Sequence, residues 1–245
     1  MSSSKKRVVI TGMGLVSCLG NEPDLFYQRL LNGESGISMI EEFPIEEIPT
    51  KFAGRVIGFD PGEYVDKKLA RRADRFILFG LYAAKRAILS ANIALDGSQI
   101  RDKTRAGVVM GSGVGGMSTF AENQTILLNK GPRRISPFVI PYIIPNMCGG
   151  LVAKDLGFMG PNYSISTACA TSNYCILSAA KHIISGEVDI MLAGGTEAPL
   201  CPIGVAGFCA LKALSERNDA PQKASRPWDK GANGGRVSAE NTAVN

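Results

Sequence analysis

The sequence predicts an α/β fold with a mostly parallel sheet. Short apolar runs rich in β-branched residues end in glycine or other small residues, and amphipathic segments of helical length separate these runs. The composition is that of a globular protein, with 45% hydrophobic and 20% charged residues among 245. Alternating strands and helices are typical of parallel sheets with helical crossovers, and a chain of this length can form a sizeable core.

Four runs are predicted to be strands, because four or five consecutive apolar residues are typical of strands buried on both faces. They are RVVITG at 7–12, AGVVMGSG at 106–113, YSIST at 163–167 and VDIMLAGG at 188–195. Helices are predicted at 23–32, 73–91 and 170–185, with Gly186 ending the last one. Segment 135–153 is uncharged but interrupted by prolines, so we expect a buried, irregular wall rather than a membrane span.

Composition also limits the chemistry. The net charge of 27 − 22 = +5 is too small for a nucleic-acid binder unless the charge is clustered. Six cysteines without a CxxC pair and a single histidine do not form the usual zinc spacings, so we expect no metal and no cofactor. The glycines at 12–14 and 111–116 lack the remaining residues of nucleotide-binding motifs. No membrane helix and no export or transit signal is predicted, and no membrane partner is expected.

The segment PNYSISTACATSNYC, residues 161–175, carries the sharpest chemical signal. We expect a strand to end at Thr167 and a helix to begin near Ala170, which places Cys169 at the turn between them. Small residues flank the thiol, and unpaired N–H groups at a helix N-terminus stabilise a thiolate over a thiol. The alternative is a small buried cysteine beside the sheet, and the local pattern leaves both interpretations open.

His182, the single histidine, is not expected to serve Cys169 as a base. Thirteen residues along one helix span about 20 Å, so we expect His182 at the surface or at an interface. Cys175 lies six positions after Cys169 and points to another side of the helix. A cysteine hydrolase, a further reading of the elbow, therefore has no general base.

Basic residues occur in two groups: Lys67, Lys68, Arg71, Arg72 and Arg75, then Lys130, Arg133 and Arg134. Cations at the start of a helix oppose its dipole, so helix stability does not explain the first group. The groups predict either an acidic macromolecular partner or a solvated face. Aromatic residues for base stacking are not interleaved with them, so nucleic acid is not expected.

Seven segments, in order along residues 7–230, resemble the N-terminal half of the β-ketoacyl-[acyl-carrier-protein] synthases, which are condensing enzymes of the thiolase superfamily. The segments are RVVITGMGLVSCLG, GESGIS, GSGVGG, GPRRISPF, GPNYSISTACATSNY, AGGTEAPLCPIGVAGF and ALSERNDAPQKASRPWDK. STACATSNYC is most similar to the plastid and bacterial elongating type, so the plastid stroma or the cytoplasm is the expected location. The resemblance implies a thiolase-like layered α-β-α fold, with a mostly parallel or mixed five-stranded sheet in this half.

The resemblance also implies roles for particular residues. Cys169 matches the nucleophile that takes the acyl chain as a thioester, and its N–H would be one oxyanion-hole donor. Val114 and Phe208 fall where the family lines or gates the acyl pocket. The face that docks the acidic acyl carrier protein is matched by Arg71, Arg72, Arg133, Arg134 and Lys212. A homodimer is implied as well, with the strand before the cysteine pairing across the two-fold axis.

We expect residues 1–230 to form this N-terminal domain and residues 231–245 to be an unrelated, disordered tail. The family's C-terminal half, with its two active-site histidines, is expected to be absent. The predicted function is that of a 3-oxoacyl-[acyl-carrier-protein] synthase, an acyltransferase that condenses an acyl thioester with malonyl carrier protein and releases CO2. This truncated chain is expected to acylate Cys169 without completing condensation. The alternative is a non-catalytic fragment that binds full-length synthase subunits or the carrier protein.

Overall fold

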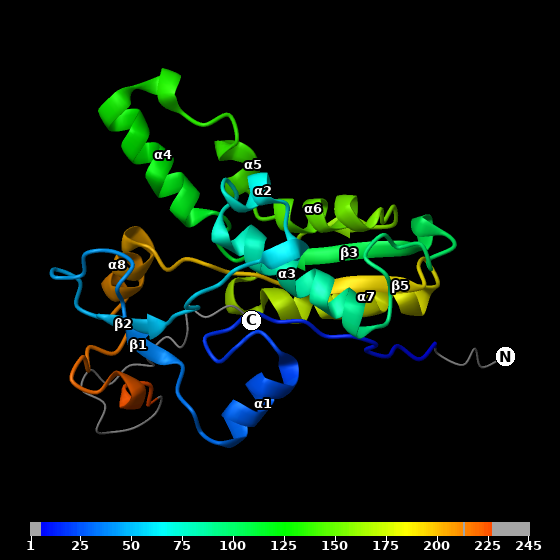
Figure 1. Ribbon diagram of the computed structural model, residues 1–245, viewed down its shortest axis with the longest axis horizontal. Helices are drawn as coiled ribbons and strands as arrows, with labels where there is room; N and C mark the ends of the chain where they lie inside the picture. The colour runs from blue at the N-terminus through cyan, green and yellow to red at the C-terminus, as the bar shows by residue number, and fades with distance from the viewer. Residues whose placement is uncertain (1–5, 213, 227–245) are drawn as a thin grey trace.

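The computed structural model describes residues 6–212 and 214–226; the expected tail, 231–245, lies outside them. Within these residues the strands form a parallel sheet in the order β4-β3-β5 and a separate antiparallel hairpin, β1-β2 (Figure 1). The strands are β1 Ile37–Met39, β2 Phe52–Gly54, β3 Ala106–Gly111, β4 Asn162–Tyr163 and β5 Ile190–Gly195. The predicted α/β class with a parallel sheet is confirmed.

Eight α-helices and five short 3-10 helices connect the strands in the described residues. The α-helices are α1 Pro23–Leu31, α2 Lys67–Ala70, α3 Arg75–Ser90, α4 Met117–Lys130, α5 Val139–Ile143, α6 Met147–Leu156, α7 Thr171–Ser185 and α8 Pro202–Ala210. The 3-10 helices are η1 Gly62–Tyr64, η2 Lys103–Arg105, η3 Pro132–Arg134, η4 Ala168–Ala170 and η5 Pro221–Lys223. In Figure 1, α4 and η3 extend away from the sheet as an arm that returns through α5.

Strand β3 is the centre of the parallel sheet, and all six of its residues are buried. It pairs with β5 along its full length, from Ala106 opposite Ile190 to Gly111 opposite Gly195. A strand buried on both faces needs a helix layer on each side. Helices α6 and α7 both contact β3, and α7 also contacts β5, while α3 packs against α6. The strand is therefore enclosed between helices, as its continuous apolar sequence predicts.

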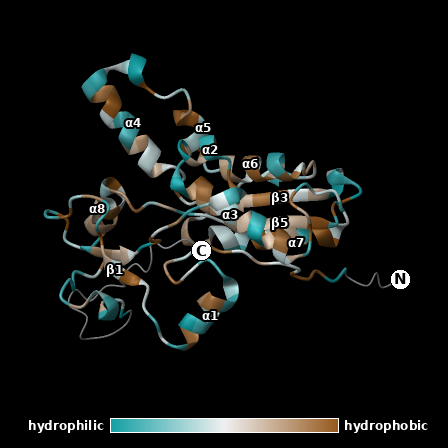
Figure 2. Cartoon of the chain, in the orientation of Figure 1, coloured by the Kyte–Doolittle hydropathy of each residue, from teal (hydrophilic) through white to brown (hydrophobic). Residues whose placement is uncertain are grey.

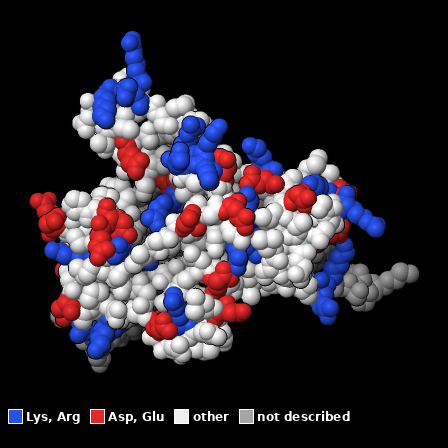
Figure 3. Space-filling model, in the orientation of Figure 1, with Lys and Arg blue, Asp and Glu red and all other residues white. Residues whose placement is uncertain are grey.

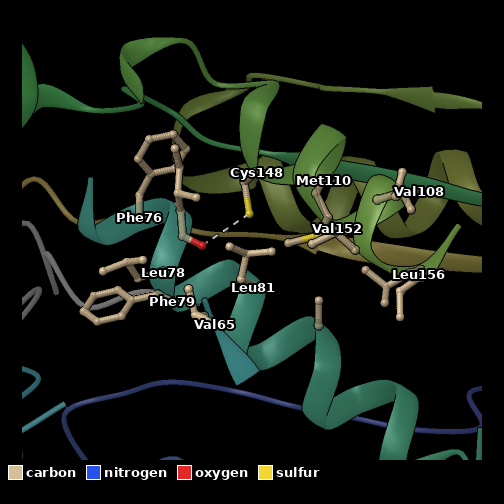
Figure 4. Close-up of a cluster of buried hydrophobic side chains, with 14 of the residues drawn as sticks. Val65, Phe76, Leu78, Phe79, Leu81, Val108, Met110, Cys148, Val152 and Leu156 are labelled. Carbon is tan, nitrogen blue, oxygen red and sulfur yellow. Dashed lines mark hydrogen bonds between the residues drawn. The ribbon is translucent and has the colours of Figure 1, made fainter. Parts of the chain in front are cut away.

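The main core lies between α3, α6 and β3 (Figure 4). Phe76 and Leu81 of α3 and Val152 of α6 are all 0% exposed. Gly80 lets the two helices approach closely, because a Cβ atom there would lie 2.2 Å from the Sγ of Cys148. In Figure 2 the hydrophobic colour is concentrated on β3 and on much of α6 and α7, which agrees with a core built around the sheet.

Asp74 caps α3 and ties it to the arm. Its Oδ1 accepts the N–H of Phe76 at 3.3 Å, and its Oδ2 accepts the N–H of Thr119, in α4, at 2.9 Å. The side chain is buried, and burial raises the pKa of the Asp74 carboxyl above its ordinary value of 3.8, although the N–H donors act in the opposite direction. Asp74 is thus a buried carboxyl that joins two helix N-termini.

The Asp74→Asn substitution should have a pH-dependent effect on stability. Because the pKa of Asp74 is raised in the folded state, its proton-linked contribution is complete below the ordinary pKa and is lost as pH rises through the raised value. The free energy of unfolding of the wild-type chain, relative to Asp74→Asn, should therefore fall as pH rises above the ordinary pKa of 3.8. Urea unfolding of both chains measures the two free energies, and a wild-type stability that rises with pH relative to that of Asp74→Asn would contradict the assignment.

The first predicted strand, at 7–12, does not form. This segment is extended and has no strand pairing in the described residues, and Val9 and Ile10 are 60% and 79% exposed. It leads instead along α3, where a Cβ at Gly12 would lie 2.2 Å from the carbonyl oxygen of Ala87. A strand requires a neighbouring strand to take its hydrogen bonds, and in the described residues β5 pairs only with β3. The outer edge of β5 is consequently unpaired there.

Two further expectations need correction. The predicted strand at 163–167 is reduced to the two residues of β4, which pair with Val108 and Val109, so the described parallel sheet has three strands rather than five. Segment 135–153 is not irregular, because it contains all of α5 and most of α6. The prolines at 141 and 145 lie inside α5 and in the turn before α6. No helix among the described residues is long and apolar enough to cross a membrane.

Candidate functional site: a cysteine elbow at the carboxyl ends of the parallel strands

Cys169 lies in η4, between the segment that follows β4 and the start of α7, as predicted. Ala168, the residue before it, has a φ of 51°, in the left-handed region that residues with a Cβ rarely adopt. The Thr171 hydroxyl donates to the Ala168 carbonyl at 2.8 Å and accepts the Thr167 N–H at 3.0 Å. Thr171 therefore holds the chain in a sharp, strained turn that presents the thiol.

The thiol of Cys169 is exposed, whereas the other five cysteines are buried or half-buried. It precedes a helix of 15 residues, whose N-terminus favours negative charge. In the described residues no acceptor takes the Cys169 N–H, whereas the Ala170 N–H is bonded to the Thr167 carbonyl. The elbow therefore offers a nucleophilic atom and a free backbone donor on the same residue, the combination that acyl transfer requires.

The glycine loop after β3 lies against this elbow. The Ser166 hydroxyl donates to the carbonyl oxygens of Ser112 and Gly113 at 2.8 and 3.3 Å, and a Cβ at Gly113 would lie 3.4 Å from the Cα of Ala168. Val114 follows at once and is 41% exposed. The structure thus brings the loop that carries Val114 to the same sheet edge as Cys169, and its role in lining an acyl pocket stays a prediction.

Glu197 is a site residue that the sequence reasoning missed. It follows β5, and its carboxylate accepts hydrogen bonds from the Ser112 hydroxyl at 2.7 Å, the Gly113 N–H at 2.6 Å and the Val114 N–H at 3.3 Å. A signal was present, because polar residues that follow parallel strands meet at the carboxyl edge of the sheet. Cys169, Ser112 and Glu197 each follow such a strand.

Phe208 lies half-buried on α8, the helix that follows β5. This helix packs on the β1-β2 hairpin through Val205, and its Gly204 approaches Met117 at the start of α4. The gating role of Phe208 stays a prediction.

His182 takes no part in the elbow. Its Nε2 lies 2.7 Å from the Tyr163 hydroxyl and its Nδ1 lies 2.6 Å from the Glu187 carboxylate, while the Tyr163 hydroxyl also bonds to Ser178. These contacts join β4 to the last turns of α7. The expectation that the histidine and the thiol form no dyad agrees with this geometry.

The five basic residues matched to the docking face are all exposed. Arg71 and Arg72 follow α2, Arg133 and Arg134 lie in η3, and Lys212 follows α8. The Arg72 guanidinium stacks over the ring of Phe138 at 5.1 Å, which links the end of α2 to the base of the arm. Figure 3 shows Lys and Arg gathered over α2 and at the tip of the arm.

Comparison with known proteins decides the family. The family described as "Beta-ketoacyl synthase, N-terminal domain" matches residues 5–244. The chain belongs to the β-ketoacyl synthase family. Within that family Cys169 lies at the position that the resemblance assigns to the nucleophile. Among the described residues no three His, Cys, Asp or Glu side chains come together as metal ligands would.

Curated relatives are named 3-oxoacyl-[acyl-carrier-protein] synthases. The chain is 56% identical over 230 residues to "3-oxoacyl-[acyl-carrier-protein] synthase I, chloroplastic" of Arabidopsis thaliana, covering 94% of this chain and 49% of the relative. It is 46% identical to "3-oxoacyl-[acyl-carrier-protein] synthase 2" of Vibrio harveyi, covering 94% of this chain and 55% of that relative. The chain therefore spans about half the length of the curated relatives it matches.

Solved structures agree on the fold. A β-ketoacyl synthase from Burkholderia phymatum superposes with a TM-score of 0.81 at 28% identity, covering 95% of this chain and 56% of that one. A type II polyketide ketosynthase, in complex with its acyl-carrier protein, superposes with a TM-score of 0.76 at 29% identity, covering 93% of this chain and 54% of that one. The thiolase-like architecture of the N-terminal half is therefore confirmed.

Proposed function

We propose that this chain is the N-terminal half of a 3-oxoacyl-[acyl-carrier-protein] synthase of fatty-acid biosynthesis, and that it forms an acyl thioester on Cys169. The observation that carries the proposal is the exposed thiol on a strained elbow, with the unbonded N–H of the same residue beside it. In the transfer, the Cys169 thiolate attacks the carbonyl carbon of a carrier-bound acyl thioester. The C–S bond to the carrier breaks and the carrier thiolate leaves, while the Cys169 N–H stabilises the transient oxyanion.

Condensation needs a second set of groups that activate malonyl carrier protein and release CO2. The only histidine of the 245 residues, His182, bonds to Tyr163 and Glu187 at the last turns of α7. We therefore propose that the 245-residue chain on its own carries out acyl transfer and does not complete condensation. The Arabidopsis thaliana relative that is named a 3-oxoacyl-[acyl-carrier-protein] synthase is about twice this length.

Incubation of the purified chain with acyl carrier protein bearing a radiolabelled acyl group tests both parts. We expect the label in the peptide that contains Cys169 and no 3-oxoacyl product after malonyl carrier protein is added. Absence of label would overturn the acyl-transfer proposal. A condensation product made by this polypeptide alone would overturn only the statement about the second step.

The acidic acyl carrier protein is the proposed macromolecular partner, and the exposed arginines after α2 and in η3 support the proposal. The names of the curated relatives refer to this carrier, and one solved neighbour is described in complex with its own carrier. Three of the relatives are chloroplastic by name, so we propose the plastid stroma or the bacterial cytoplasm as the location.

Reversing Arg133 and Arg134 to Glu should weaken carrier binding about tenfold or more at low salt, and the loss should shrink as salt rises, because exposed charges are screened. Fluorescence anisotropy with labelled carrier protein measures the affinity. A double variant at Arg101 and Lys154, exposed basic residues elsewhere, carries the same change in net charge and is the matched control. Equal losses in both double variants, or a loss independent of salt, would contradict docking at η3.

A second candidate function, binding to another synthase polypeptide without catalysis, is favoured by the exposed apolar side chains. On α7, Tyr174, Ile176 and Leu177 are each 50% exposed, and Val9 and Ile10 are exposed beside α3. Exposed apolar side chains that gather into a patch are typical of protein interfaces. Size-exclusion chromatography of the chain alone and with a full-length synthase tests this proposal, as it tests the homodimer. A monomer that elutes apart from the synthase would count against both.

A further inference from the structure

We infer that Glu197 is a positioning residue that fixes Val114 and the loop around it relative to the Cys169 thiol. The inference rests on the proposed acyl transfer at Cys169. Glu197 reaches across 83 to 85 positions of sequence to bind the loop after β3. It lies beneath the loop, and nothing in its contacts places it on the reacting atoms.

The carboxylate occupies a concave arrangement of donors. Its Oε1 accepts from the Ser112 hydroxyl and the Val114 N–H, and its Oε2 accepts from the Gly113 N–H. Successive backbone N–H groups turned toward one point form an anion-binding nest, and an ionised carboxylate makes stronger bonds there than a neutral acceptor. Ser112, which is 1% exposed, extends the network by accepting the Gly115 N–H at 2.9 Å.

The loop is therefore held from two sides. Glu197 binds its N–H groups, and Ser166, three residues before Cys169, binds the carbonyl oxygens of Ser112 and Gly113. On the far side, the Gly116 N–H donates to the Ile143 carbonyl at 3.1 Å. Val114 lies between these anchors and is the exposed side chain of the turn. A shift of the Glu197 carboxylate would move Val114 relative to the elbow without changing the thiol itself.

Because the two carboxylate oxygens of Glu197 accept from different donors, the Glu197→Gln variant removes some of the hydrogen bonds to the loop and keeps others. In Glu197→Gln one carboxylate oxygen is replaced by an NH2 group, which cannot accept from the N–H of Gly113 or of Val114, so at least one of these two backbone bonds is lost whichever way the amide turns. The variant therefore frees at least one N–H group of the loop that carries Val114. Glu122→Gln, at an exposed position on α4, is the same chemical change away from the loop and is the matched control.

The test compares alkylation of Cys169 by N-methylmaleimide and N-octylmaleimide, read by mass spectrometry of the Cys169 peptide. We expect Glu197→Gln to change the ratio of the octyl rate to the methyl rate by at least threefold. Val114→Ala should change the same ratio, and Glu122→Gln should leave it within the error of the wild type. A merely structural role would lower the octyl and methyl rates by the same factor. An unchanged ratio of the two rates in Glu197→Gln would therefore overturn the inference.

Amide hydrogen exchange supplies a second readout. Exchange at Gly113 or at Val114 should become at least tenfold faster in Glu197→Gln, and unchanged exchange at both would overturn the inference. If Glu197→Gln does not fold, Ser112→Ala removes one of the three bonds, and an unchanged maleimide ratio in that folded variant would overturn the inference equally. Maleimides need no carrier protein. Failure of carrier-bound acyl groups to label Cys169 would therefore overturn the proposed function and leave this test intact.

Discussion

Replacing Cys169 with alanine is expected to reduce acylation of the chain to the background of the assay. The thiol is the one exposed cysteine of six, and it alone lies on the elbow before α7. Burial raises the pKa of Cys148 to about 12 and also raises the pKa values of Cys18 and Cys175, so these thiols are less able to form the nucleophilic thiolate. Labelled acyl carrier protein followed by peptide mapping measures the loss.

The control for this prediction is Cys18→Ala. Cys18 is a free, half-buried thiol distant in sequence from the elbow, so its removal should leave labelling unchanged. The Cys169→Ala chain should also unfold at the same temperature as the wild type, since an exposed side chain contributes little packing. Label that persists in Cys169→Ala would place the acceptor on another residue.

Replacing Gly111 with alanine is expected to lower the free energy of unfolding by about 3 kcal/mol, through overpacking next to the elbow. Gly111 ends β3, and a Cβ there would lie 1.9 Å from the carbonyl oxygen of Ile165 and 2.6 Å from the Cγ2 of Thr171. The first clash is with backbone, which cannot rotate away. The segment between β4 and Cys169 or the start of α7 has to move, so acylation of Cys169 should fall as well.

Gly194→Ala in β5 is the matched control for Gly111→Ala. Gly194 faces Met110 across the ladder, one position before the Gly111–Gly195 pair, and a Cβ there would meet no atom within 4 Å. Its stability should stay the same or rise by up to about 1 kcal/mol, because alanine loses less backbone entropy than glycine. Urea unfolding measures both variants. Equal stabilities of the two variants would contradict the close approach of β3 to the elbow.

The parts of the fold that the sequence predicts well are those with a strong local pattern. The apolar run that becomes β3 is buried on both faces, and the amphipathic segment that becomes α3 supplies Phe76 and Leu81 to the core. The elbow at Cys169 was predictable because small residues and a helix start surround it. Gly186 ends α7 with a φ of 79°, as a C-terminal glycine should.

The parts that the sequence did not predict depend on partners far along the chain. Residues 7–12 have the pattern of a strand, but in the described residues no strand lies beside them to accept their hydrogen bonds, and Gly12 lies against α3 instead. Glu197 carries no local motif, because its contacts with Ser112 and Gly113 exist only once β3 and β5 are paired. A pattern of neighbours in sequence does not contain such long-range contacts.

The outer side of β5 affects how the purified protein has to be handled. Within the described residues the amide and carbonyl groups on this edge have no partner strand, so a second molecule can pair with them. The exposed apolar side chains of Val9 and Ile10 give such a molecule further surface for contact. Recruitment of this kind is bimolecular and weakens steeply on dilution. Reaction rates of the Cys169 thiol should therefore be measured at the lowest workable protein concentration. A dilution series would separate the reactivity of single molecules from that of associated ones.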